Sequence, residues 1–115
     1  MSMKVSFEGI GDMIATFPAA DDVVKGWVVK LDEDGQVCAC GDGDRFVGTA
    51  VNVREGFAGV RLGGLARVGC SGAVPGCGWV KLAADGKGGV KSDSSGQEYL
   101  AVAADASAET IVIRL

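Results

Sequence analysis

Few side chains in this sequence could do chemistry, and histidine is absent from all 115 residues. Without histidine there is no histidine general base, no Ser–His–Asp triad and no histidine ligand for catalytic zinc. Gly69-Cys70-Ser71-Gly72 only partly matches the Gly-x-Ser-x-Gly turn of a nucleophilic serine, because its second glycine comes one residue early. We find no pair of carboxylates placed for acid–base work. We therefore predict a protein that is not an enzyme and has no cofactor.

Four cysteines offer the next possible chemistry: Cys38, Cys40, Cys70 and Cys77. An even number in a short chain suggests disulfides only where the chain is secreted. Cys38 and Cys40 lie two residues apart and would share one face of a strand, so a four-thiolate zinc site is another possibility. Structural zinc usually uses Cys-x-x-Cys turns, which are absent. Reduced thiols packed as small apolar side chains are the favoured interpretation, and a disulfide or zinc stays open.

Acidic and glycine-rich stretches could bind ions, but their spacing does not fit. Asp32-Glu33-Asp34-Gly35 lacks the glutamate that a calcium loop places six residues after its glycine, because Gly41 stands there. Gly63-Gly64 and Gly86-Lys87-Gly88-Gly89 lack the spacing of a phosphate-binding loop. The first stretch fits a solvated hairpin turn better, since Asp-Gly is a common hairpin signal.

Composition narrows the class of protein. The chain is 48% apolar, which argues against disorder, and its formal net charge of −4 argues against binding to nucleic acid. No apolar run approaches the roughly 20 residues of a membrane span. The first residues lack the apolar stretch of a signal peptide, so we expect synthesis in the cytoplasm.

Short apolar runs separated by glycine-rich turns dominate the pattern. The 19 glycines against two prolines suit many short strands joined by tight turns. No segment keeps a helical period for 12 residues. We predict an all-β fold, a small single-domain barrel or sandwich of about nine short strands over residues 1–115. The expected strands are 4–8, 13–17, 27–31, 36–40, 46–53, 57–62, 65–70, 79–82, 90–91, 98–103 and 110–115.

Both tryptophans follow a glycine and begin an expected strand. The ordinary interpretation of Trp27 and Trp79 is a large core side chain near the end of a barrel. The alternative is an interface anchor, because tryptophan is enriched among the residues that dominate binding energies.

Five short motifs that combine glycine with an apolar strand follow one another along the chain. They are Val24-Lys25-Gly26-Trp27-Val28-Val29, Gly35-Gln36-Val37, Phe46-Val47-Gly48-Thr49-Ala50, Gly64-Leu65-Ala66-Arg67-Val68, and Gly78-Trp79-Val80-Lys81-Leu82 with Asp85-Gly86. In this order they resemble the motifs of small head proteins of tailed phages and prophages, which decorate and stabilise the capsid, and the resemblance covers most of residues 4–115. The four cysteines are not part of that pattern.

The resemblance implies a virion structural protein on the capsid exterior. Its partner would be the major capsid protein, and it would form a homo-oligomer, most often a trimer, without nucleic acid or membrane. A β domain with an exposed edge can add a strand from a neighbour, and the two terminal strands are the natural candidates. The expected interface residues are Lys4, Val5, Phe7, Trp27, Trp79, Ile111 and Ile113.

Two other functions stay open from the sequence. A β module that binds a small ligand or carbohydrate would have a pocket lined by Trp27, Trp79 or Tyr99. A small enzyme or metal protein would bind zinc through Cys38 or Cys40.

Overall fold

The structure is a computed structural model that describes residues 13–115, and in that range it contains ten β-strands and no helix. The predicted all-β class is therefore confirmed, and the ten strands correspond to the ten expected ranges that lie within residues 13–115. The strands are β1 (Met13–Pro18), β2 (Val28–Leu31), β3 (Val37–Ala39), β4 (Gly48–Arg54), β5 (Phe57–Gly63), β6 (Leu65–Ser71), β7 (Gly78–Ala84), β8 (Val90–Ser92), β9 (Gln97–Asp105) and β10 (Thr110–Arg114).

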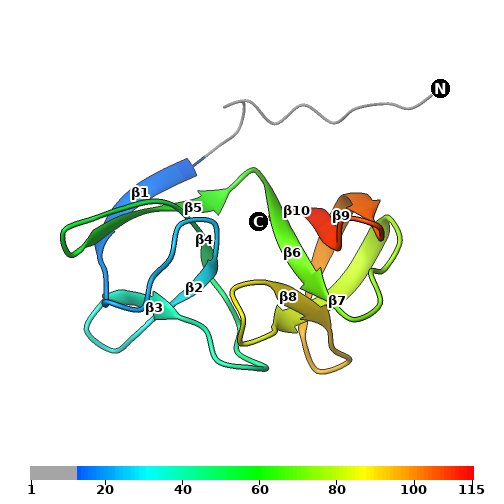
Figure 1. The fold of residues 1–115 in the computed structure, drawn as a ribbon, viewed down its shortest axis with the longest axis horizontal. Helices are drawn as coiled ribbons and strands as arrows, with labels where there is room; N and C mark the ends of the chain where they lie inside the picture. The colour runs from blue at the N-terminus through cyan, green and yellow to red at the C-terminus, as the bar shows by residue number, and fades with distance from the viewer. Residues whose placement is uncertain (1–12) are drawn as a thin grey trace.

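The strands divide between two sheets that lie side by side along the molecule (Figure 1). The N-terminal sheet has the order β1-β5-β4-β2-β3. The other five strands close into a barrel with the order β10-β6-β8-β7-β9, in which only β6 and β8 run parallel. The sequence predicts a barrel or a sandwich but does not reveal this division into a sheet and a separate barrel.

Each sheet has its own apolar core. In β6 the residues alternate between buried and exposed, with Ala66, Val68 and Cys70 facing the barrel interior. Successive strand residues point to opposite faces, so this period of two places one row in the core and the other in solvent. The core of the N-terminal sheet is built from short side chains: Val23, Val29, Val37, Ala50, Ala58 and Val60.

Strand β2 joins the two cores. Val28 packs in the barrel core, whereas its neighbour Val29 packs in the core of the N-terminal sheet. The backbone N–H of Val28 donates to the carbonyl of Gly88, between β7 and β8, at 3.0 Å. Trp27 lies directly against Gly88, where a side chain would collide with the indole ring. This joint fixes how the barrel meets the sheet.

The sheet edges determine where another chain could pair. Among residues 13–115, β1 pairs with β5 alone, so one of its sides is unpaired. At the opposite edge of the N-terminal sheet, Ala19 forms a bridge with Val37 of β3. Strand β10 pairs with β6 on one side and β9 on the other. The expectation that the C-terminal strand is free to pair with a neighbour is therefore wrong, because closing the barrel uses both of its edges.

Candidate functional site

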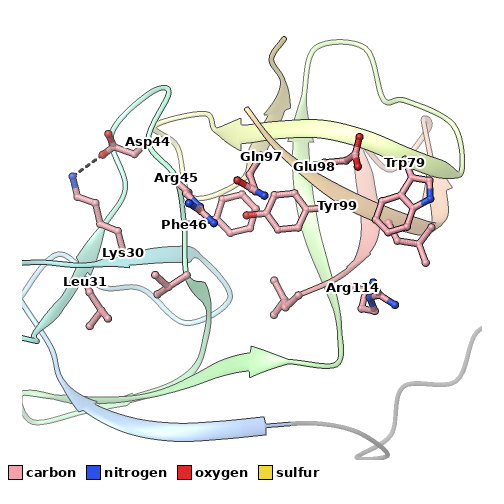
Figure 2. A pocket seen from close by; sticks show the side chains of 13 residues that line it. Lys30, Leu31, Asp44, Arg45, Phe46, Trp79, Gln97, Glu98, Tyr99 and Arg114 are labelled. Atoms are coloured by element: carbon pink, nitrogen blue, oxygen red, sulfur yellow. Dashed lines mark hydrogen bonds and ion pairs between the residues drawn. The ribbon is translucent and has the colours of Figure 1, made fainter. Parts of the chain in front are cut away.

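An open groove of about 650 Å³ lies between the barrel and the N-terminal sheet (Figure 2). Strands β7, β9 and β10 supply one wall. Lys30 and Leu31 of β2, with the segment before β4, supply the other. The lining residues are Lys30, Leu31, Asp44, Arg45, Phe46, Val47, Trp79, Gln97, Glu98, Tyr99, Leu100, Arg114 and Leu115.

Trp79 lies at one end of the groove, and its side chain is 61% exposed. It stands directly opposite Leu100 of β9, which in turn stands opposite Arg114 of β10. Residues in such cross-strand register share one face of the sheet, here the outer face of the barrel. The guanidinium of Arg114 lies over the indole, 5.8 Å from the ring centroid, within the range of a cation–π contact. The fold thus holds a large aromatic surface in contact with solvent.

Tyr99 and Phe46 form the middle of the groove, where their rings stack at a centroid distance of 4.9 Å and an angle of 10° (Figure 2). Phe46 belongs to the barrel core, and Tyr99 packs against that core while remaining partly exposed. Burial raises the pKa of the Tyr99 hydroxyl. The phenol is therefore neutral at physiological pH and can both donate and accept a hydrogen bond.

Charged groups surround the aromatic side chains. At the end away from Trp79, the Lys30 ammonium donates to the Asp44 carboxylate at 2.6 Å. That hydrogen bond, together with one from the Gly41 backbone N–H, lowers the pKa of Asp44. Arg45 and Glu98 are both exposed, and between residues 13 and 115 neither forms an ion pair. Considering the described residues alone, the groove thus offers a guanidinium and a carboxylate without an ion-pair partner, beside the stacked aromatic rings.

Two of the predicted site residues take different places. Trp79 lines the groove, so the ordinary interpretation of a core side chain is wrong for it. Trp27 does not line the groove, because its indole is half-buried against Gly88 at the joint between the sheets. Tyr99, expected only as part of a ligand pocket, does line it.

The remaining predicted interface residues divide into two groups. Ile111 and Ile113 are completely buried in the barrel core, so a partner cannot reach them and their predicted interface role is wrong. The two side chains share one face of β10, and that face points into the barrel. Lys4, Val5 and Phe7 lie outside the described residues.

The sequence alone does not single out four polar residues that line the groove: Arg45, Gln97, Glu98 and Arg114. One signal was available for the barrel wall. Lys81 shares a strand face with Trp79, and a lysine there indicates that this face meets solvent. Arg45 could not have been found this way, because only the tertiary fold brings the segment before β4 beside β9.

All four cysteines are free thiols, and no group of three or more metal-ligating side chains forms within residues 13–115. The zinc site considered for Cys38, Cys40, Cys70 and Cys77 is therefore not assembled, and the disulfide alternative is also wrong. Burial raises the pKa of Cys40 to about 12 and also raises the pKa of Cys70. Both thiols pack in the barrel core, as the favoured interpretation predicts, but that interpretation is wrong for Cys77, which is exposed, and Cys38 is only partly buried.

A second surface feature is a mainly apolar strip at the β1 edge of the N-terminal sheet, where β1 has a partner on one side only among residues 13–115. Ile14, Thr16 and Pro18 alternate along β1 and share one face, and Phe57 of β5 stands directly opposite Pro18. Ile14 is 50% exposed and Phe57 is 54% exposed. We call these four residues the edge strip.

No protein-family model matches this chain, and no curated protein matches its sequence. Within residues 13–115 there is also no helix long and apolar enough to cross a membrane.

Proposed function

We propose that this chain is a capsid-decoration protein of a tailed phage or prophage. It is a non-enzymatic virion protein that binds the outer surface of the capsid and stabilises the shell. The resemblance of its ordered motifs to head-decoration proteins supports this proposal. The observation that carries it in the structure is the edge strip, an exposed apolar surface beside a strand that is paired on one side only within residues 13–115.

The edge strip suits a partner that supplies both a strand and apolar side chains. An unpaired strand edge accepts main-chain hydrogen bonds from an added strand, and neighbouring apolar side chains give that pairing its specificity. A capsid presents the same partner surface many times. When copies of the decoration protein are joined in a homo-oligomer, with a trimer favoured, several weak contacts act together.

The contribution of one side chain in the edge strip can be approximated. A phenylalanine buries roughly 200 Å² when fully covered, so covering the exposed half of Phe57 removes about 100 Å² from water. At about 25 cal/mol per Å², this contact contributes about 2.5 kcal/mol per copy. Ile14, with a similar exposed fraction, contributes a comparable amount.

Partner and location follow from the same proposal. The partner is the major capsid protein, and the protein lies on the virion exterior after synthesis in the host cytoplasm. The net charge of −4 disfavours contact with packaged nucleic acid, where cationic side chains would supply the affinity.

The proposal is tested by adding the purified protein back to particles that lack its gene product. Wild-type protein should sediment with the particles. The double variant Ile14→Ser with Phe57→Ser should bind at least about a thousandfold more weakly, because the two contacts together contribute about 5 kcal/mol. Val24→Ser is the control, because Val24 is also an exposed apolar residue but lies outside the edge strip. Failure of the wild-type protein to bind would contradict the proposed function.

Equal binding of the double variant and the wild type would instead show that the edge strip is not the docking surface. Far-ultraviolet circular dichroism of each variant checks that the sheets are intact. Both substituted side chains are half exposed, so we expect little loss of stability.

A further inference from the structure

We propose that the groove is a binding site for an oligosaccharide, with one sugar ring packed against Trp79 and further rings extending towards Tyr99 and Arg45. This role goes beyond the proposed attachment to a capsid and uses a different surface. The capsid contact proposed above uses the edge strip and leaves Trp79, which the sequence predicts as an interface residue, outside that contact.

The first argument is the pair of aromatic surfaces. The C–H faces of a sugar ring are weakly apolar and pack against the face of an aromatic side chain. Trp79 is 61% exposed, and Arg114 lies over one face of its ring, so a sugar ring would pack against the exposed remainder of the indole. Tyr99 adds a second partly exposed ring, kept in place by its stacking on Phe46. Rigid aromatic side chains bind at a low cost in conformational entropy.

The second argument is the set of polar groups beside these rings. Sugar hydroxyls donate and accept hydrogen bonds, so they need partners of both kinds. Gln97 can do both, Glu98 accepts, and Arg45 donates. These three side chains are exposed and lie around the groove (Figure 2). Arg45 and Glu98 form no ion pair within the described part of the chain, so a ligand would not need to break one.

The third argument concerns the competing ligand, a peptide, which in an extended form usually pairs its main chain with a free strand edge. Among residues 13–115, the stretch 97–99 of β9 pairs with β7 alone, and Lys30 and Leu31 of β2 pair with β3 alone. These one-sided stretches are only three and two residues long, so the side chains of the groove carry most of the recognition, which suits a ligand bound through hydroxyl groups and ring faces.

The size and shape of the groove agree with a chain of sugars. Its volume of about 650 Å³ lies within the range of roughly 300–1,000 Å³ for small-ligand sites. Figure 2 shows Trp79 and the Lys30–Asp44 pair at opposite ends, with Tyr99 between them. Because the groove is open to solvent, a ligand can extend beyond it, as an internal stretch of a polysaccharide would.

Isothermal titration calorimetry tests this proposal with the full chain and five hexasaccharides: cellohexaose, chitohexaose, laminarihexaose, maltohexaose and hexagalacturonate. At least one should bind at concentrations up to about 5 mM. Trp79→Ala should weaken that binding about tenfold or more, and Glu98→Ala should weaken it several-fold. Lys87→Ala is the control, since Lys87 is exposed and does not line the groove. Binding by none of the five sugars, or equal binding by Trp79→Ala and wild type, would overturn the proposal.

The same variants separate this proposal from the proposed function. Trp79→Ala should sediment with particles as well as the wild type does. The edge-strip variant, with serine at Ile14 and Phe57, should lose particle binding but keep its affinity for the sugar. If Trp79→Ala instead loses particle binding and no sugar binds, the groove is part of the capsid contact and the saccharide site is refuted, while the decoration role stands.

Discussion

Replacing Gly88 with alanine should destabilise the protein far more than the same change at another glycine of similar conformation. Gly88 has a φ of +91°, and a Cβ there would lie within 3.0 Å of three ring atoms of Trp27. The positive φ costs an alanine about 1–2 kcal/mol. Displacing a packed ring adds about 1–3 kcal/mol, as overpacking does in protein cores. We expect a total loss of about 3 kcal/mol in the free energy of unfolding.

Gly72 provides the matched control. Its φ is +73°, and a Cβ there would meet no atom within 4 Å. Gly72→Ala should therefore lower the free energy of unfolding only through the strain of a positive φ at alanine, about 1 kcal/mol. Urea unfolding followed by far-ultraviolet circular dichroism gives the free energy of unfolding of each variant. If the transition stays two-state, the dependence of that free energy on urea concentration should be the same for both variants. Equal destabilisation by the two variants would refute the account of the joint, because it would mean that Trp27 is not packed on Gly88.

Further predictions concern titration and thiol chemistry. Burial alone would raise the pKa of Asp85, but hydrogen bonds from the Ser71 hydroxyl and from two backbone N–H groups outweigh it and lower that pKa. The stabilisation is present above the ordinary aspartate pKa of about 3.9 and is lost as the pH falls through the lower folded-state value. Urea unfolding from pH 6 to pH 2 should therefore show a shallower decline for Asp85→Asn than for wild type, and an identical decline would contradict this. With a chromogenic disulfide at pH 8, exposed Cys77 should react fastest, whereas buried Cys40 and Cys70 should react only on unfolding. Mass mapping of the modified thiols checks the order, and early labelling of Cys40 would show that the barrel core is open.

The strands could be predicted from the sequence because their signals are local. Alternation in Leu65–Ser71 and the Asp-Gly turns at residues 34–35 and 85–86 depend on neighbouring residues alone, and the structure places a hairpin at each of those turns. Sheet membership depends on contacts between distant segments, so the division into barrel and sheet could not be read in this way. The burial of Ile111 and Ile113 illustrates the difference. Their shared face was evident, but its direction depends on how the barrel closes.

The candidate groove could not be predicted from local sequence signals either. The sequence singles out Trp79 and Tyr99 as aromatic residues, but nothing local indicates that one is exposed and the other partly buried. Arg45 reaches the groove only because the segment between β3 and β4 runs along β7, where the Ala84 N–H donates to the Asp44 carbonyl at 2.9 Å. Binding surfaces built from separate segments need the tertiary fold before their chemistry can be seen.

The measurement that tests the central claim most directly is quantitative mass spectrometry of DNA-filled phage particles purified from the host that carries this gene. The decoration role predicts that the protein is present in amounts comparable to the major capsid protein, and that it stays with the particles through purification. Its absence from intact particles, in a preparation where the major capsid protein is abundant, would contradict that role.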